Sequence, residues 1–259
     1  MTYTAHYHRS IEDPEGFWAA QAETIDWFEA PKQILSQDKD GLYRWFEGGK
    51  MNTCHLALDY HVANGRGDQT ALIYDSPVTQ SFCRYTYREM LDETARLAGA
   101  LQSLGIEKGD RVIIYMPMIP QVVFAMLACA RLGAVHSVVF GGFAAHELAL
   151  RIDDAKPKVI LTASAGVEFD KIIPYKPFVD AAVKEAVHKV NHVVVYQRWM
   201  KRVELTNPGE LDWTDLVNRS KPVACTAVDA VDPLYILYTS GTTGKPKGIV
   251  RDNGGHAVA

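Results

Sequence analysis

Residues 233–248 read Pro233-Leu-Tyr-Ile-Leu-Tyr-Thr-Ser-Gly-Thr-Thr-Gly-Lys-Pro-Lys-Gly248, a short apolar run followed by a loop rich in glycine, hydroxyl and lysine side chains. The apolar run up to Tyr238 predicts a buried strand. Glycines let the loop backbone approach a ligand closely. Free N–H groups, hydroxyls and ammonium groups together suit a polyphosphate. A solvated turn after a strand has the same composition, so composition alone leaves both interpretations open.

The spacing of this loop differs from that of the common P-loop, which requires G-x-x-x-x-G-K-[ST]. From Gly241 the chain reads G-x-x-G-K-P-K-G. Pro246 stands where a P-loop has the hydroxyl that holds Mg²⁺, and proline there disfavours the helix that follows a P-loop. The stretch therefore predicts a phosphate loop of another kind.

Upstream of the loop, apolar strands alternate with helices. Continuously apolar strands joined by helices predict an α/β fold with a largely parallel sheet covered on both faces. Ligands of such sheets bind at the carboxyl ends of the strands. Gly141-Gly142 and the loop from Thr239 both follow a strand, so they could line one crevice; a tight strand-to-helix turn explains the two glycines equally well. The expected strands are 111–115, 135–140, 159–162, 192–196 and 234–238, and the expected helices are 87–104, 120–132, 146–155, 178–187 and 213–218.

The first 60 residues are expected to form an N-terminal extension that packs on the main domain, residues 61–259. Asp13-Pro14 predicts a helix start, followed by an aromatic-rich helix that includes Phe17, Trp18, Ile25, Trp27 and Phe28. These aromatic residues either pack across another surface or form a small cluster of their own. Asn52 is expected to cap a helix that runs to about Ala63, and two strands, 70–74 and 82–86, to flank a turn.

Composition is that of a soluble globular protein, with 259 residues, 47% hydrophobic and 22% charged. A net charge of −4 gives no reason to expect nucleic acid binding. No apolar run approaches the roughly 20 residues of a membrane span, and no apolar signal core begins the chain, which predicts a cytoplasmic location.

Metal and disulfide sites are not predicted. The cysteines, at positions 54, 83, 129 and 225, form no C-x-x-C pair, which argues against a disulfide framework or a structural zinc site. Cys129 is expected to be a core residue. His188 and His192 have the i,i+4 spacing of a helical chelate, but the chain is expected to pass from helix to strand between them.

Several segments resemble one enzyme family. The loop itself, Met116-Pro-Met-Ile-Pro120 and Val139-Phe-Gly-Gly-Phe143 resemble the short-chain branch of the AMP-forming acyl-CoA synthetases, in the adenylate-forming superfamily. Ile73-Tyr-Asp-Ser-Pro-Val78 and Gly248-Ile-Val-Arg-Asp-Asn-Gly-Gly-His256 are most similar to propionyl-CoA synthetases (propionate–CoA ligases). An acetyl-CoA synthetase or another adenylate-forming ligase is the alternative, and a non-catalytic nucleotide-binding module is the alternative of another class.

The resemblance implies two reaction steps. A short-chain carboxylate such as propionate attacks the α-phosphorus of ATP, and coenzyme A then displaces AMP from the acyl-adenylate. The implied substrates are small molecules, namely ATP with Mg²⁺, the carboxylate and coenzyme A, with no prosthetic group; the oligomeric state stays open. Lys247 is the implied catalytic residue. Binding of ATP and pyrophosphate is implied for Thr239, Ser240, Gly241, Thr242, Thr243, Gly244, Lys245 and Lys247.

Coenzyme A binding is implied for Gly141 and Gly142 and for the segment Glu168, Phe169, Asp170 and Lys171. Glu168 departs from the family pattern, because acetyl-CoA synthetases have an arginine there, and a carboxylate would repel a phosphate. Full-length members of the family are more than twice as long as this chain. The resemblance therefore implies an N-terminal fragment that is inactive alone, with the pocket that selects the acid beyond residue 259.

Overall fold

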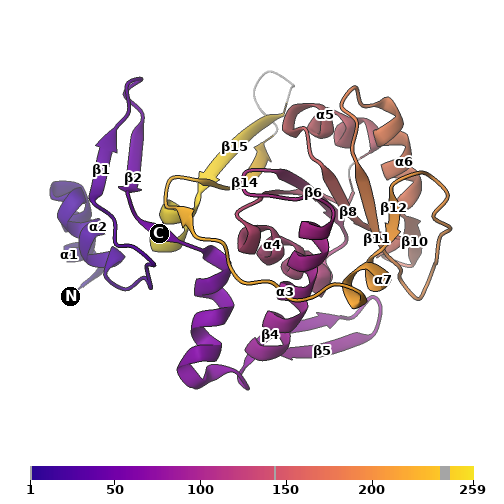
Figure 1. The fold of residues 1–259 in the computed structure, drawn as a ribbon, viewed down its shortest axis with the longest axis horizontal. Helices are drawn as coiled ribbons and strands as arrows, with labels where there is room; N and C mark the ends of the chain where they lie inside the picture. Colours follow the sequence, from indigo (N-terminus) through magenta and orange to yellow (C-terminus); the bar gives the residue numbers. More distant parts are fainter. Residues whose placement is uncertain (1, 143, 240–245) are drawn as a thin grey trace.

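The computed structural model describes residues 2–142, 144–239 and 246–259. Figure 1 shows a central sheet with helices packed around it. Seven strands form this sheet in the order β12-β11-β8-β6-β7-β14-β15. They are β6 (Arg111–Met116), β7 (Val135–Phe140), β8 (Val159–Ala163), β11 (His192–Tyr196), β12 (Glu210–Asp212), β14 (Pro233–Thr239) and β15 (Lys247–Asp252).

The strands of this sheet run parallel, except that β15 is antiparallel to β14. This confirms the predicted α/β fold. The strands β12 and β15, at the two edges of this sheet, were not among the expected strands. After β15 has paired with the edge of β14, the chain continues into a short helix, α8 (Asn253–Val258).

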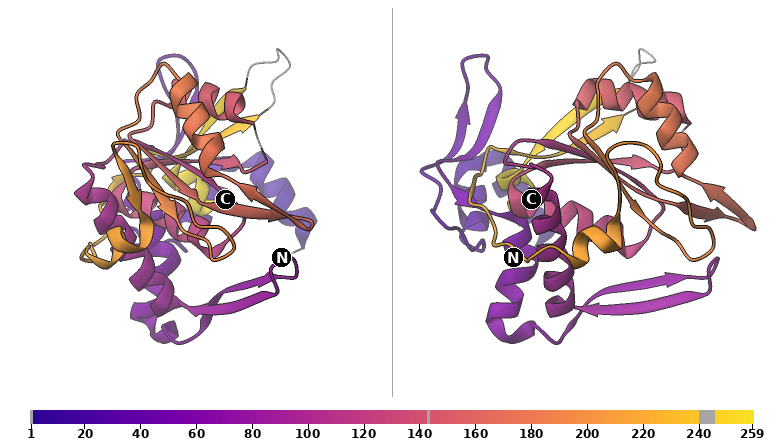
Figure 2. Two further views of the ribbon diagram at one scale, coloured as in Figure 1. Left: turned by 90° about the vertical axis from the view of Figure 1, so that its right-hand side faces the viewer. Right: turned by 45° about the vertical axis from the view of Figure 1, so that its right-hand side comes forward.

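Helices cover both faces of the sheet, as the views in Figure 2 show. Strand β6 explains why, because Val112 and Ile114 belong to one buried cluster while Ile113 and Tyr115 belong to the other. Successive side chains point to opposite faces, so a strand buried on both must be apolar throughout. One face carries α3 (Tyr87–Ser103), α4 (Pro120–Leu132) and α7 (Trp213–Asn218), and the other carries α5 (Ala145–Ala155) and α6 (Lys176–Glu185).

Local signals define the ends of the longest helix. The Thr86 hydroxyl accepts the Glu89 N–H at 3.2 Å, and the Glu89 carboxylate accepts the Thr86 N–H at 2.8 Å. This reciprocal pair satisfies two N–H groups that the first turn leaves free. After α3 the chain turns at Gly105, where φ is +80°.

The N-terminal residues form a smaller unit beside the sheet, which includes α1 (Tyr3–Glu12), α2 (Pro14–Ala22), β1 (Gln33–Gln37) and β2 (Tyr43–Glu47). The prediction of a helix that includes Ile25, Trp27 and Phe28 was wrong. The helix ends at Ala22, where the Trp27 indole N–H donates to the Ala22 carbonyl at 2.8 Å. The buried cluster of this unit joins Phe46 to Ala230, so the aromatic residues pack both on one another and on the main body.

Further elements connect these layers. Asn52 caps a helix over residues 53–66, as predicted, because its side-chain oxygen accepts the N–H groups of Cys54 and His55 at 2.9 and 3.1 Å. The stretch η1 (His55–Asp59) of this helix is π-helical, whereas in η2 (Val62–Arg66) the backbone leaves helical geometry at Asn64 and Gly65, close to the predicted end at Ala63. Strand pairs complete the fold: β3 (Lys50–Met51) with β13 (Val228–Asp229), β4 (Thr70–Ser76) with β5 (Ser81–Thr86), and β9 (Ala165–Glu168) with β10 (Lys171–Pro174).

None of the helices in the described ranges is both long and apolar enough to cross a membrane.

Candidate functional site

Two of the segments selected from the sequence leave the carboxyl ends of neighbouring parallel strands. Gly141 follows β7, and the loop from Thr239 follows β14, which lies beside β7 in the sheet. Carboxyl ends of parallel strands meet at one edge, where open α/β sheets bind ligands. The fold therefore brings both segments to the edge at which a site was expected.

The ends of the phosphate loop face each other. Thr239, the last residue of β14, is the Cα partner of Lys247, the first residue of β15. Both residues are exposed. The antiparallel pair therefore holds the two ends of the loop together and places the Lys247 backbone opposite Thr239. The other predicted loop residues, Ser240, Gly241, Thr242, Thr243, Gly244 and Lys245, lie outside the described residues.

A polar cluster that sequence reasoning missed connects α5 to the strand before the loop. The Tyr238 hydroxyl donates to Asp154 Oδ2 at 2.6 Å, and the Arg151 guanidinium lies 5.3 Å from the centre of the Tyr238 ring. Burial and the hydrogen bond to Asp154 raise the pKa of Tyr238, so the phenol keeps its proton at neutral pH. Arg151 in turn donates to the Glu147 carboxylate at 2.8 Å. These contacts position the end of β14 from which the loop departs.

Gly248 lets β15 lie close to this cluster. A Cβ atom at Gly248 would lie 3.0 Å from Ile236 Cγ2 and 3.1 Å from Tyr238 Cε1. Both separations are tighter than ordinary van der Waals contacts. The last glycine of the motif thus has a packing role that the sequence did not reveal.

The second group of predicted residues meets around Tyr175. A Cβ atom at Gly141 would lie 2.1 Å from Tyr175 Oη, and one at Gly166 would lie 2.7 Å from Tyr175 Cε2. Only glycine therefore allows both segments to approach this ring. The Tyr115 hydroxyl also donates to the Gly141 carbonyl at 3.3 Å, and burial raises the pKa of Tyr115 to about 12. The structure thus brings Gly141 next to the hairpin that begins at Ala165.

The segment of Glu168, Phe169, Asp170 and Lys171 forms the tip of the β9–β10 hairpin, which was not predicted. Glu168 and Lys171 are Cα partners across the two strands. Phe169 has a φ of +54° and is 87% exposed. The tip therefore offers one exposed ring and two opposite charges side by side. Glu168, which stands where acetyl-CoA synthetases were noted to have an arginine, is a carboxylate that faces Lys171, the cation of this tip, across the hairpin.

Arg198 is a cation near this hairpin that sequence reasoning missed. Its backbone N–H donates to Ser164 Oγ at 2.8 Å, directly before β9 begins. Burial raises the pKa of the Tyr175 phenol, and the positive charge of Arg198 partly opposes this rise. The signal that could have found it is its place directly after the predicted strand 192–196.

Cavities in the described part of the chain lie away from these residues. One of about 360 Å³ is bounded by the segment after α2, the helix over residues 53–66 and α8, with Asp26, His61 and His256 in its lining. Another, of about 280 Å³, lies between β5 and α3. Neither is lined by a residue to which the sequence assigned a phosphate or coenzyme A role.

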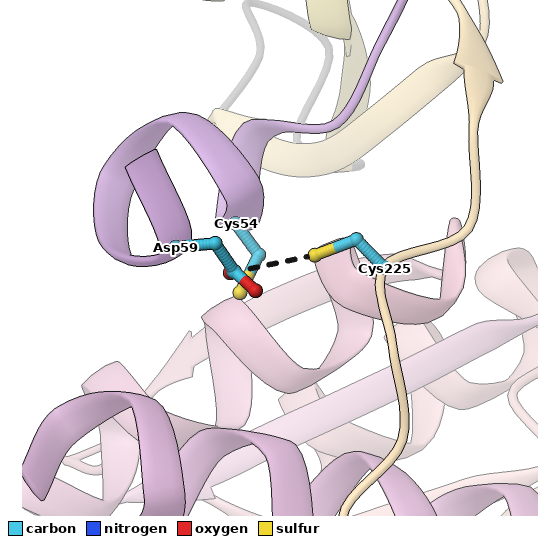
Figure 3. Close-up of side chains that lie close together, drawn as sticks. All are labelled: Cys54, Asp59 and Cys225. Atoms are coloured by element: carbon cyan, nitrogen blue, oxygen red, sulfur yellow. Dashed lines mark hydrogen bonds between the residues drawn. The ribbon is translucent and has the colours of Figure 1, made fainter. Parts of the chain in front are cut away.

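The histidine pair does not have the geometry of a helical metal chelate. His188 Nε2 lies 2.9 Å from the Pro157 carbonyl oxygen, and α6 ends at Glu185, so the i,i+4 pair is not on a helix. Cys129 is fully buried in the core, as predicted, and burial raises the pKa of its thiol to about 12. Cys54 and Cys225, which are 171 positions apart and form no paired motif, lie close together beside Asp59 (Figure 3).

The sequence matches known protein families along nearly its whole length. The family model for AMP-binding enzymes matches residues 60–258, and the model for the acetyl-coenzyme A synthetase N-terminus matches residues 3–57. The chain is 60% identical to an uncharacterised protein of Pseudomonas aeruginosa over 259 residues, which is all of this chain and 41% of that protein.

Relatives with assigned names are similar over the same span. Human mitochondrial acyl-CoA synthetase short-chain family member 3 is 48% identical over 257 residues, 99% of this chain and 38% of that protein. Propionate–CoA ligase of Escherichia coli is 44% identical over 263 residues, 100% of this chain and 41% of the ligase. The structure of acetoacetyl-CoA synthetase from Streptomyces lividans matches with a TM-score of 0.89 and 30% identity, over 100% of this chain and 39% of that one. The chain thus spans about two fifths of the length of these relatives.

Proposed function

Because the chain belongs to the family of AMP-binding enzymes, we propose that it supplies the pyrophosphate side of the ATP site in an AMP-forming acid–thiol ligase. The observation that carries the proposal is the antiparallel pairing of Thr239 with Lys247 at the carboxyl edge of the sheet. This pairing closes the motif loop on itself and leaves two exposed polar side chains at its base. Such a loop offers hydroxyl and ammonium donors to phosphate oxygens.

The proposed reaction begins when a carboxylate oxygen attacks the α-phosphorus of ATP. The bond to the bridging oxygen breaks, and pyrophosphate leaves with the electron pair. Negative charge grows on that leaving group, and the loop donors, including Thr239, Lys245 and Lys247, stabilise it. Mg²⁺ enters this scheme only as the ion that accompanies ATP. In the second step the thiol of coenzyme A attacks the acyl carbon, and AMP leaves.

For coenzyme A we propose the edge formed by Gly141, Gly142 and the β9–β10 hairpin. Gly141 and Gly166 allow close approach of the backbone, and the exposed Phe169 ring suits stacking on a base. Lys171 offers one cation to a phosphate. Glu168 opposes it as its cross-strand partner, so Asp170 and Glu168 limit the positive charge at this tip.

Propionate or a similar short-chain acid is the proposed substrate, supported by the 44% identity to propionate–CoA ligase. Acetate is the competing acid, and full-length kinetics with acetate, propionate and butyrate distinguish them. The division near residue 60 into an extension and an AMP-binding domain stays a proposal, supported by the two family models that meet there. A cytoplasmic location also stays a proposal.

The test is ATP–pyrophosphate exchange by a full-length enzyme, one that contains residues 1–259 and is as long as the relatives described above. Loss of one donor to a developing oxyanion costs about 2.7–4 kcal/mol, so Lys247→Ala should lower exchange by about 10²–10³-fold. Lys184→Ala, which removes an exposed cation from α6, is the matched control and should exchange like the wild type. Wild-type exchange by Lys247→Ala would contradict the role of Lys247.

The chain of residues 1–259 provides a second comparison. We expect it to form no acyl-adenylate from ATP and propionate, because the residues that complete the site in relatives are outside this span. Calorimetric binding of ATP by this chain, combined with no exchange in the full-length enzyme, would favour a non-catalytic nucleotide-binding module instead.

A further inference from the structure

Two cysteines far apart in the sequence meet at a contact between the helix over residues 53–66 and the extended segment that leads to β13. Figure 3 shows the side chains of Cys54, Asp59 and Cys225 gathered between the two chain segments, with a hydrogen bond drawn between Cys225 and Asp59. The two Sγ atoms and an Asp59 oxygen all lie within 4.8 Å of one another. A disulfide needs Sγ atoms about 2.05 Å apart, so the two sulfurs must approach each other further before a bond can form.

A metal ion does not suit this cluster, because a fixed cation already occupies it. Arg131 Nη1 lies 3.0 Å from Cys225 Sγ, 3.5 Å from Cys54 Sγ and 2.7 Å from Asp59 Oδ2. The same guanidinium donates from Nε to the Val223 carbonyl at 2.6 Å, and its side chain is 6% exposed. A metal would have to displace this buried group from four partners.

The two thiols differ in access to solvent. Cys54 is 0% exposed, whereas Cys225 is half-buried. The Cys225 thiol also donates to Asp59 Oδ2, at a sulfur–oxygen distance of 3.6 Å. The Arg131 guanidinium next to Cys225 Sγ can stabilise the thiolate that forms when the Cys225 proton is lost to water. Solvent access and a cation thus converge on Cys225, with a second thiol next to it.

We propose that Cys225 and Cys54 are a redox pair, in which a peroxide oxidises Cys225 and Cys54 resolves it to a disulfide. The Cys225 thiol loses its proton to water, the thiolate attacks hydrogen peroxide, the O–O bond breaks, and Cys225 becomes a sulfenic acid while the released hydroxide takes up that proton. The Cys54 sulfur then attacks the Cys225 sulfur, and the hydroxide that leaves takes the Cys54 proton. Two thiols are oxidised, and one peroxide is reduced to two waters.

The environment makes this reaction slow at neutral pH. The hydrogen bond shared with Cys54, burial and the Asp59 carboxylate raise the pKa of the Cys225 thiol, and Arg131 opposes them. Cys54, Asp59 and Arg131 are the titratable and charged groups that the described structure places against Cys225. The thiolate is therefore a minor species, and the rate of oxidation should rise with pH. The proposal is independent of the ligase activity proposed above.

The disulfide would close a long loop between the helix after Asn52 and the segment before β13. Closing a long loop restricts the unfolded chain, so the oxidised protein should resist unfolding more than the reduced protein. Asn52 already links the two segments through its bond to the Thr226 carbonyl, at 2.8 Å. The crosslink would therefore reinforce a contact that exists in the reduced state.

Peptide mapping of the purified chain tests the pair. The chain is incubated with hydrogen peroxide at about pH 8.5, where a typical thiol is half ionised, then alkylated in denaturant and digested without reductant. The expected result is a Cys54–Cys225 crosslink, a mass loss of about 2 Da and alkylated Cys83 and Cys129. The urea midpoint should rise on oxidation and return after reduction with dithiothreitol.

Three variants separate the proposed roles. Cys54→Ala should retain a sulfenic acid at Cys225 that dimedone traps, and Cys225→Ala should leave Cys54 reduced. Cys83→Ser, which changes a half-buried cysteine outside the cluster, is the matched control and should form the crosslink at the wild-type rate. Two results in the wild-type chain would overturn the proposal: oxidation of Cys83 at the same rate as Cys225, or the absence of a Cys54–Cys225 crosslink. Neither result depends on whether the variants fold.

Discussion

Replacing Asn52 should destabilise the protein more than any exposed polar substitution, because this one buried side chain joins three segments. Its amide nitrogen donates to the carbonyls of Ala130 and Thr226, each at 2.8 Å, and to that of Arg131 at 3.2 Å. Its oxygen caps the helix over residues 53–66. The side chain is 0% exposed. Asn52 thus ties the end of α4 and the segment before β13 to the start of a helix.

The magnitude follows from these contacts. Loss of an N-cap costs about 1 kcal/mol. The Ala130 and Arg131 carbonyls each keep a second donor, from Gly133 and Thr226, so each lost bond is valued at the low end of about 0.5–1.5 kcal/mol. Asn52→Ala should therefore lower the free energy of unfolding by about 2–4 kcal/mol, a large share of a typical 5–15 kcal/mol.

Urea unfolding followed by circular dichroism and tryptophan fluorescence measures this change. Asn64→Ala is the matched control, because Asn64 is exposed at the other end of the same helix and donates only to the Tyr60 carbonyl at 2.7 Å. Asn52→Asp should be more damaging than Asn52→Ala, since its carboxylate can still cap the helix but would be buried against three carbonyl oxygens to which it cannot donate. The reasoning fails if Asn52→Ala lies within about 1 kcal/mol of Asn64→Ala, or if Asn52→Asp is milder than Asn52→Ala.

Two further predictions concern Tyr238 and the buried histidine of β7. In the full-length enzyme, Tyr238→Phe should lower pyrophosphate exchange by about 2–12-fold, the equivalent of one hydrogen bond, because Asp154 then no longer positions the end of β14. The control is Tyr43→Phe, a change at an exposed tyrosine of β2. Equal exchange by the two variants would contradict the prediction. Burial lowers the pKa of His136 in the folded protein to about 4, whereas a histidine in the unfolded chain has a pKa near 6.5. As the pH falls, the unfolded chain therefore takes up the proton first. The free energy of unfolding should then decrease by an amount on the order of 3 kcal/mol between about pH 6.5 and pH 4. His136→Gln should flatten this slope in urea titrations across that range. His146→Gln should not flatten it, because the Glu185 carboxylate raises the pKa of that exposed histidine and gives the opposite sign.

Local patterns in the sequence predicted the five inner strands of the main sheet and the helices that cover it, but not the edge strands β12 and β15. Met90, Leu97 and Leu101 recur at helical spacing and are all buried in α3. The strand 111–115 is apolar at nearly every position, and the structure buries it on both faces. Such patterns are readable because burial repeats with the period of the element itself. The phosphate-loop motif was readable for a similar reason, since its residues are contiguous.

Contacts between distant residues could not be read in this way. Strand β15 forms because the edge of β14 is free, although Ile249 and Val250 are both more than half exposed and give no burial pattern. The hydrogen bond between Asp154 and Tyr238 joins α5 to β14, and the cysteine pair joins residues 54 and 225. No periodicity within either partner encodes such a meeting, because it depends on which strands become neighbours in the sheet.

The sequence by itself therefore determined the fold class, the helices and the five inner strands of the main sheet, and the loop that resembles the signature of the acyl-CoA synthetases. Tertiary structure alone decided that Thr239 and Lys247 close that loop, that Tyr175 brings Gly141 to the hairpin at Ala165, and that two thiols share one buried arginine. The physical reason is one of range. Side-chain periodicity acts within a single element, whereas these sites are assembled by chain topology from elements that are remote in sequence.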